Sequence, residues 1–181
     1  DFAFQNQGNL GFINKAKEWG LSAPNFSNGS AYGDLDNDGD LDLVISAVNS
    51  VASILKNEST RMLPENKYLK FELSGLRGNT FAFGTKITIR HREKIFYLEQ
   101  MPIRGFESSM DPRPNVGLGK IDTVEQILIQ WPDGKVNLLL NTPTNQILKL
   151  DQRKGVPLDS IDSHTLEKNK DSSPIFREVE S

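Results

Sequence analysis

The sequence contains no cysteine, which excludes disulfide bonds and thiolate chemistry. It also has no apolar run close to the roughly 20 residues that a membrane-spanning helix needs. Neither a methionine nor a signal peptide stands at its start, and we expect the chain to be a piece of a longer protein. These absences are compatible with a bacterial cell surface, so the compartment has to be inferred from the motifs that are present.

The chain also has little net charge, only -3 over 181 residues. The negative charge is concentrated in one short aspartate-rich loop, and the rest of the chain is close to neutral. We therefore expect neither a general attraction for basic partners nor a broad nucleic-acid footprint. A chain of this length has room for one large domain or two small ones.

The most informative stretch that is present covers residues 33–44, with the sequence GDLDNDGDLDLV. Aspartate occupies every second position of it: Asp34, Asp36, Asp38, Asp40 and Asp42. Carboxylates spaced so closely repel one another, and a hard cation such as calcium, which takes about six to eight oxygen ligands, removes that repulsion. Gly39 stands at the sixth position of the loop, where a sharp turn needs a residue without a Cβ atom.

The end of this loop differs from an EF-hand. An EF-hand has a bidentate glutamate at its twelfth position, where this chain has Ile45, so Asp42 is left as the closing ligand. The run from Leu41 to Ile45 is apolar and β-branched without a helical period, which predicts a strand after the loop. We interpret the stretch as a calcium loop that leads into a strand, against the alternative of a solvated acidic turn.

The residues Asp34-Leu-Asp36-Asn-Asp38-Gly39-Asp40-Leu-Asp42-Leu-Val resemble the calcium loop of FG-GAP or VCBS-type repeats, the blades of integrin-like β-propellers. The resemblance implies that the carboxylates of Asp34, Asp36, Asp38 and Asp42 bind calcium and that the Asp40 backbone carbonyl completes the shell. Residues 1–62 would then be one repeat. A single blade cannot close a propeller, and its sheet edges would need cover.

Around the loop we expect a brief helix from Asn14 to Trp19, a polar loop from Pro24 to Gly33, a strand to Ala47 and a second strand over 51–56.

Residues 63–150 have the pattern of a small β-domain. Six short strands are predicted, over residues 68–73, 85–90, 94–99, 124–131, 135–140 and 145–150, and the turn Pro132-Asp133-Gly134 makes a hairpin of the fourth and fifth. We expect a core of Leu69, Phe71, Leu73, Ile87, Ile89, Leu98, Ile127, Ile129, Trp131 and Leu138. The sequence therefore predicts an all-β chain, with an incomplete β-propeller-type repeat followed by a small antiparallel β-sandwich or barrel.

Four blocks in this region resemble the ASPIC/UnbV domain of cartilage acidic protein-like chains. They are NTFAFGTKI from Asn79, GFESS from Gly105, VGLG from Val116 and IQWPDGK from Ile129. The chain departs from the usual family pattern at Phe83, Thr85 and Val116, and it has Pro102-Ile103-Arg104 in place of a glycine-serine run. Residues 151–181 are polar, and we interpret them as a linker or tail that leads into a possible further repeat near Ser173–Val179.

The sequence offers no convincing catalytic set, and we expect no enzyme. His91 and His164 fit solvated positions, Ser108-Ser109 lacks a nucleophile elbow, and Gly117-Leu-Gly119 fits a tight turn better than a phosphate loop. Basic residues gather in the sequence near Phe81, Phe83, Phe96 and Tyr97: Arg77, Lys86, Arg90, Arg92, Lys94 and Arg104. No RNP1-like run accompanies them, which argues against nucleic acid.

We interpret the chain as a non-enzymatic, Ca2+-binding adhesion or recognition module of an extracytoplasmic protein, secreted or at a bacterial cell surface, with an unknown protein or glycan ligand. One alternative is a carbohydrate-binding accessory of a polysaccharide-processing protein, for which Trp131 and Phe106 are candidate contacts, although we expect both in a core. A less favoured alternative is RNA binding by the β-domain.

Overall fold

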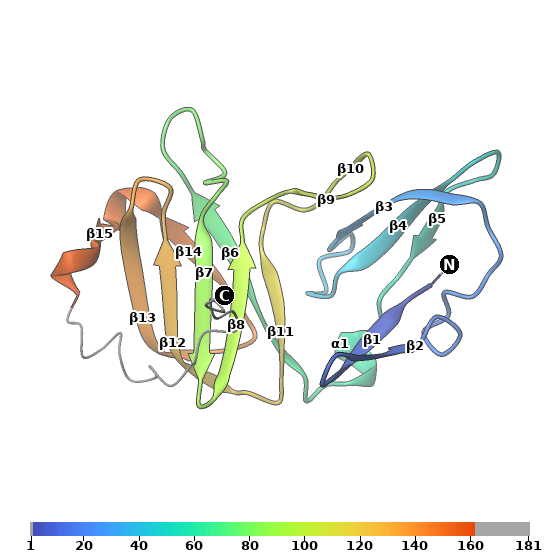
Figure 1. Ribbon diagram of the computed structural model, residues 1–181, viewed down its shortest axis with the longest axis horizontal. Coiled ribbons are helices and arrows are strands. Elements are labelled where there is room, and N and C mark those ends of the chain that lie inside the picture. The colour runs from blue at the N-terminus through green and yellow to red at the C-terminus, as the bar shows by residue number, and fades with distance from the viewer. Residues whose placement is uncertain (1, 162–181) are drawn as a thin grey trace, which may run out of the picture. The chain divides into compact units, whose positions relative to one another are not determined.

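The computed structural model describes residues 2–161 (Figure 1). Strands account for 50% of the described residues and helices for 6%, which confirms the predicted all-β class. The chain divides into two compact units, one of Asp1–Pro64 with Pro102–Asp111 and the other of Glu65–Met101 with the residues from Pro112 onward. Residues 102–111 therefore belong to the first unit, although in the sequence they lie between the two segments that form the second unit. The domain boundaries given by the sequence stay predictions.

The first unit consists of short antiparallel strands. Strands β1 (Phe4–Gly8) and β2 (Gly11–Asn14) form a hairpin, β3 (Ser27–Gly33), β4 (Asp42–Ala47) and β5 (Ser53–Leu55) form a sheet in that order, and β9 (Ile103–Gly105) pairs with β10 (Ser108–Ser109). Its one helix, α1, is short and spans Ser59–Met62. The strand predicted after the aspartate loop is confirmed as β4, and the one predicted over 51–56 is confirmed as β5.

Two predictions in this unit are wrong. The expected helix from Asn14 to Trp19 is a single turn, in which Trp19 N donates to Lys15 O and Asn14 Oδ1 accepts from Ala16 N. One turn makes too few hydrogen bonds to offset the cost of fixing its backbone as a helix. The expected polar loop from Pro24 to Gly33 contains β3, which forms by pairing with β4 although its own sequence has no strand pattern.

Apolar side chains of the first unit are largely exposed. Among its described residues only Ala16 and Ile45 are buried apolar side chains. Exposed large apolar side chains are Phe2, Phe4, Leu10, Phe12, Ile13, Trp19, Phe26, Leu35, Val48, Val51, Ile54, Met62, Leu63, Ile103 and Phe106. The expectation that Phe106 lies in a core is therefore wrong. The described part of the first unit therefore has only a small core.

The second unit is a β-sandwich. One sheet has the order β11-β6-β14 and the other the order β15-β13-β12-β7-β8 (Figure 1). The strands are β6 (Lys67–Ser74), β7 (Lys86–His91), β8 (Lys94–Glu99), β11 (Asn115–Gly119), β12 (Thr123–Gln130), β13 (Lys135–Pro143), β14 (Gln146–Asp151) and β15 (Val156–Pro157). All pairs are antiparallel except β14 with β6, so the antiparallel prediction needs that correction.

All six strands predicted for this region are present, with ends displaced by at most a few residues, and the Pro132–Gly134 turn joins β12 to β13. Gly117 and Gly119 lie in β11, so the predicted tight turn is wrong there. Residues 152–161, which the sequence assigns to the linker, form two 3-10 helices, η1 (Gln152–Lys154) and η2 (Leu158–Ser160), with β15 between them. The possible further repeat near Ser173–Val179 lies outside the described residues.

The core lies between the two sheets. It contains Leu69, Phe71, Leu73, Ile87, Ile89, Ile127, Ile129 and Trp131 as predicted, Leu98 packs against it, and Ala82, Leu118 and Val124 add to it. Leu138 is a wrong prediction. Leu138 pairs with Leu128, whereas Leu139 pairs with the fully buried Ile127, and residues directly opposite each other share a face of the sheet. Leu139 is therefore the leucine that packs against the core.

At the end of β14, the Asp151 side chain caps η1. Its carboxylate accepts from Arg153 N at 2.9 Å and pairs with the Arg153 guanidinium at 2.6 Å. These bonds lower the pKa of Asp151 from 3.8 to about 2. Because the pKa is lower in the folded chain, the ionised carboxylate stabilises the fold above its ordinary pKa, and this stability is lost as the pH falls through about 2.

We therefore expect Asp151→Asn to lower the melting temperature at pH 7, and the difference from the wild-type chain to shrink between pH 4 and pH 2. Melting followed by circular dichroism across this range measures it. Asp159→Asn, an exposed acid in η2, is the matched control. A difference that does not change with pH would mean that the charge of Asp151 is not its cause.

Candidate metal centre

The aspartate-rich loop connects two neighbouring strands of the first unit. Gly33 at the end of β3 pairs with Asp42 at the start of β4, so residues 34–41 form the loop of this hairpin. Asn37 and Gly39 have positive φ values of 61° and 97°. The φ of Gly39 supports the reason for which the sequence analysis singled it out, because a side chain is strained in this conformation.

Three loop carboxylates turn inward toward the loop's own amides. Asp34 Oδ1 accepts from Gly39 N at 3.5 Å, Asp36 Oδ1 from Asp38 N at 3.3 Å, and Asp38 Oδ1 from Asp40 N at 3.1 Å. The carboxylates of Asp34, Asp36 and Asp38 each place an oxygen within 4.8 Å of the others. Asp34 is half-buried and the other two are exposed, so the cluster is open to solvent. Three negative charges therefore converge on one point of the loop.

A lysine that the sequence analysis did not identify lies beside this cluster. The ammonium of Lys56, which follows β5, forms ion pairs with Asp36 and, at 3.3 Å, with Asp38. The hydrogen bond from Lys56 lowers the pKa of Asp36, and the two carboxylates raise the pKa of Lys56. Lys56 thus supplies one positive charge beside two of the three carboxylates.

Asp42 has a different setting, because it is only 3% exposed. Its Oδ2 accepts from Leu35 N at 3.0 Å and its Oδ1 from Asn57 N at 2.8 Å. The carboxylate thereby ties the start of the loop to the segment after β5. Each carboxylate oxygen has a second lone pair, so these bonds leave acceptor capacity for a cation.

The Asp40 side chain turns toward α1. Its carboxylate, on a residue 7% exposed, accepts from Ser59 Oγ at 3.0 Å, from Thr60 N at 2.8 Å and from Thr60 Oγ1 at 2.5 Å. The carboxylate of Asp40 is therefore occupied outside the cluster of Asp34, Asp36 and Asp38. The expectation that Asp40 contributes its backbone carbonyl stays a prediction, as do all five aspartates as metal ligands.

The donors that the loop presents fit a hard divalent cation. They are oxygen atoms only, and calcium tolerates the irregular arrangement of a loop. Asn57, Ser59 and Thr60 hold the two buried aspartates, and the sequence carried no signal for them because they lie 15 to 20 residues away.

Of the basic residues singled out by sequence, Arg104 belongs to the first unit and the others to the second. On β8, Phe96 pairs with the core residue Ile89 and packs on the core, whereas Tyr97 points to the opposite face and is exposed. Phe96 is therefore removed as a stacking platform for RNA, whereas Tyr97 lies on the same face of the sheet as Lys86 and Arg90.

Of the other candidate residues, Trp131 lies in the core as expected, which removes it as a ligand contact. Ser108 Oγ donates to Phe106 O at 2.7 Å within the β9–β10 turn. His164 lies outside the described residues. Among residues 2–161 there is no helix with the length and apolar character that crossing a membrane requires.

Two comparisons with known proteins give a match. Over 118 residues, 60% of this chain, the sequence is 30% identical to Cartilage acidic protein 1 of Xenopus tropicalis, and the match spans 16% of that protein. Residues 75–157 match the family described as ASPIC and UnbV. The resemblance to FG-GAP and VCBS repeats stays a prediction. Residues 75–157 are therefore an ASPIC and UnbV domain.

Proposed function

We propose that the chain is a non-enzymatic, calcium-binding recognition module of an extracytoplasmic surface protein, with adhesion as its role. The observation that carries this proposal is the convergence of Asp34, Asp36 and Asp38 within 4.8 Å in a loop whose remaining two aspartates are buried and bonded. An ASPIC and UnbV domain, and a relative named for cartilage, support a location outside the cytoplasm.

The carboxylates of Asp34, Asp36, Asp38 and Asp42 and the backbone carbonyl of Asp40 would hold the ion. Calcium, when bound, supplies the positive charge that relieves the repulsion among these groups. The protein's own part is to hold the loop closed: Asp42 bonds to Leu35 and Asn57, and Asp40 bonds to the start of α1. Calcium binding therefore strengthens the connection between the β3–β4 hairpin and the segment after β5.

The exposed apolar side chains support the interpretation of the first unit as one repeat of a propeller. Two buried apolar residues give a unit of this size little stability of its own, because burial of apolar surface is the main force that holds a fold together. We propose that neighbouring repeats of the natural protein cover these side chains.

Thermal unfolding with and without calcium tests the proposal. Extracellular calcium modules bind with Kd on the order of 10⁻⁴–10⁻³ M, so 10 mM calcium adds about 1.4–2.7 kcal/mol to the stability of the unit that binds it. We expect its melting temperature to rise by roughly 5–20 °C, measured by calorimetry. Magnesium at the same concentration and sodium chloride at the same ionic strength are the controls. Identical melting in calcium and in chelator would contradict calcium binding.

Glycan binding by the second unit is a second candidate, favoured by an exposed pair of aromatic rings. Phe81 and Phe83 stack with ring centroids 5.7 Å apart, and both are exposed. The side chain of Asn79 bonds to both backbone groups of Phe83, and Gln100 Nε2 donates to Phe81 O. The loop thus presents two rings in a fixed position. A glycan array probed with wild-type chain and with Phe81→Ala separates this candidate from the first, which requires no sugar signal.

A further inference from the structure

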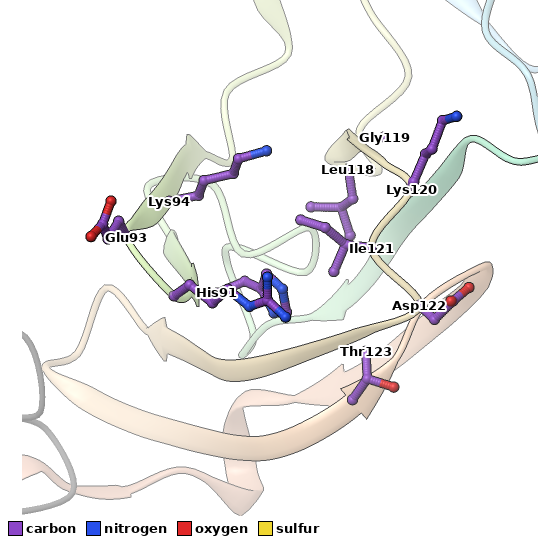
Figure 2. A pocket seen from close by; sticks show the side chains of 10 residues that line it. His91, Glu93, Lys94, Leu118, Gly119, Lys120, Ile121, Asp122 and Thr123 are labelled. Atoms are coloured by element: carbon purple, nitrogen blue, oxygen red, sulfur yellow. The ribbon is translucent and has the colours of Figure 1, made fainter.

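The open pocket of the second unit is lined by balanced charges. It has a volume of about 720 Å³ and lies between the β7–β8 turn and residues 118–123 (Figure 2). The lining residues and their partners carry as many positive as negative charges: Lys67, Arg92, Lys94, Lys120, Glu65, Glu93, Asp122 and Glu125. Nδ1 of His91 is buried without a hydrogen-bond partner among the described residues, so this atom is not solvated as expected and does not reach the open space. Neither feature selects a ligand.

Strand β3 lies at an edge of its sheet and is the longest described strand of the first unit. An uncovered edge strand offers a row of unpaired N–H and C=O groups to any other strand. Proteins protect such edges with charged side chains, with proline or by keeping the strand short. The strand at the opposite edge, β5, has only three residues, whereas β3 has seven, SNGSAYG, without a charge or a proline. β3 therefore needs cover from another part of the chain.

Residues 102–111, which we call the edge cover, lie against β3. Tyr32 N donates to Met110 Sδ at 3.4 Å, and Tyr32 O accepts from Asp111 N at 3.4 Å. Within its own sheet Tyr32 lies opposite Leu43 of β4. In an antiparallel pair, every second residue points both of its backbone groups away from its partner. Tyr32 is such a residue, and the edge cover occupies both of its outward groups.

The edge cover also approaches β3 closely at Gly29. A Cβ atom at this position would lie 2.9 Å from Phe106 O and 2.9 Å from Ser108 Oγ. Phe106 O belongs to the backbone and accepts from Ser108 Oγ at 2.7 Å, so it moves only with the β9–β10 turn. The strand is held too, because Gly29 N donates to Ser46 Oγ at 2.9 Å. The lack of a side chain at residue 29 therefore allows the edge cover to lie on β3.

We propose that residues 102–111 keep the edge of β3 covered, and that the uncovered edge pairs with β3 of a second copy of this chain. The two strands would run antiparallel about a two-fold axis, and the outward backbone groups of each would bond to the other. A second copy fits because β3 has no charge, so two copies do not repel each other, and its side chains are mostly small.

The proposal goes beyond calcium binding, because it uses none of the loop aspartates. The edge cover lies inside the segment 75–157 that matches the ASPIC and UnbV family, but it belongs to the first unit. This part of the family segment would therefore keep the first unit from associating with other copies.

Gly29→Ala tests the proposal with one methyl group. The added Cβ atom displaces the edge cover, and we expect the variant to dimerise at least about tenfold more tightly than the wild-type chain, measured by analytical ultracentrifugation. Gly117→Ala is the matched control. Gly117 also lies in an edge strand, β11, but a Cβ atom there meets no described atom within 4 Å. We expect this control to associate like the wild-type chain.

Amide hydrogen exchange followed by NMR reports on the edge cover itself. In Gly29→Ala we expect the Asp111 amide to exchange faster than in the wild-type chain, because its bond to Tyr32 O is lost. At high protein concentration we expect the Tyr32 amide of the variant to exchange more slowly, because it then bonds to the second copy.

Two further variants make the test specific to β3. Ser30 is exposed, and Ser30→Lys combined with Gly29→Ala would bring like charges together between two paired copies. We expect this combination to return association to the wild-type level. A glycine-serine linker in place of residues 103–109 removes the edge cover even where the fold tolerates the methyl group of Gly29→Ala, and we expect this variant to dimerise.

Three outcomes would overturn the proposal: a linker variant that associates no more than the wild-type chain, dimers that persist when Ser30→Lys is added, or equal association of Gly29→Ala and Gly117→Ala. All measurements are made in calcium and in chelator. The expected dimer does not require calcium, so this proposal and calcium binding can fail separately.

Discussion

The double substitution Asp36→Asn with Asp38→Asn is expected to weaken calcium binding by about 100-fold and to abolish the rise in melting temperature that calcium causes. Asparagine keeps a carbonyl oxygen at each position, so the number of ligands is unchanged and only two negative charges are lost. Calcium affinity in such loops depends on the number of charged ligands, and each tenfold change corresponds to about 1.4 kcal/mol. Isothermal titration calorimetry measures the affinity.

Asp36 and Asp38 are the appropriate positions because both are exposed and their carboxylates face the cluster. Asp42→Asn would not be as clear a test. Both oxygens of Asp42 accept backbone N–H groups, so its substitution disturbs the hairpin whether or not calcium is present. Asp159→Asn, in an exposed 3-10 helix of the second unit, provides the same chemical change away from the loop. If the double variant kept its calcium-dependent melting, the loop would not be the binding site.

Substitution of Lys56 is expected to change calcium affinity at the same site in the opposite direction. Its ammonium pairs with Asp36 and Asp38, so it competes with any cation that these carboxylates bind. Lys56→Met removes the competitor and is expected to raise calcium affinity by about two- to fivefold, the range that corresponds to an exposed ion pair. A gain from this variant and a loss from the double variant would together assign binding to the cluster. A loss from both would indicate that Lys56 has a structural role instead.

Local patterns explain why part of this site was predictable from sequence. The alternation of aspartates, Gly39 and the apolar run after Asp42 lie within one short stretch, and each has a direct chemical meaning. The partners of the buried aspartates are not local. Thr60 lies 20 residues from Asp40, and nothing in the sequence around Thr60 indicates that it would hold a carboxylate. Lys56 was missed for the same reason.

The fold shows the same division between local and distant signals. The Pro132–Gly134 turn fixes a hairpin from its own residues, and that prediction is confirmed. Leu138, Leu139 and Leu140 are consecutive leucines, so alternation alone does not say which one faces inward, and the register with β12 decides it. Ser27–Gly33 is polar and rich in small residues, and it becomes a strand only because β4 pairs with it.

The segment that matches the family is shorter than the folded domain. The match begins at residue 75, after the end of β6 at Ser74. Yet β6 is the central strand of its sheet, and its residues Leu69, Phe71 and Leu73 belong to the core. Phe71 is fully buried, and its N donates to Pro114 O at 2.9 Å. The folded domain therefore needs residues that precede the matched segment.

Phe71→Ala is expected to destabilise the second unit by about 3–5 kcal/mol, because it removes a buried ring and leaves a cavity. For a unit of roughly 100 residues this lowers the melting temperature by more than about 10 °C. The chain has two tryptophans, and Trp131 lies in the same core while Trp19 lies in the first unit. In a Trp19→Phe background, the fluorescence of Trp131 therefore reports the unfolding of the second unit alone.

The matched control is Phe81→Ala, which removes the same ring from a position 54% exposed. Its expected cost is at most about 1.5 kcal/mol, mainly from the lost stacking with Phe83. Urea unfolding of both variants, followed through Trp131, compares the two costs directly. If Phe71→Ala were no more destabilising than Phe81→Ala, β6 would not be part of the core, and the domain would be limited to the segment that the family match covers.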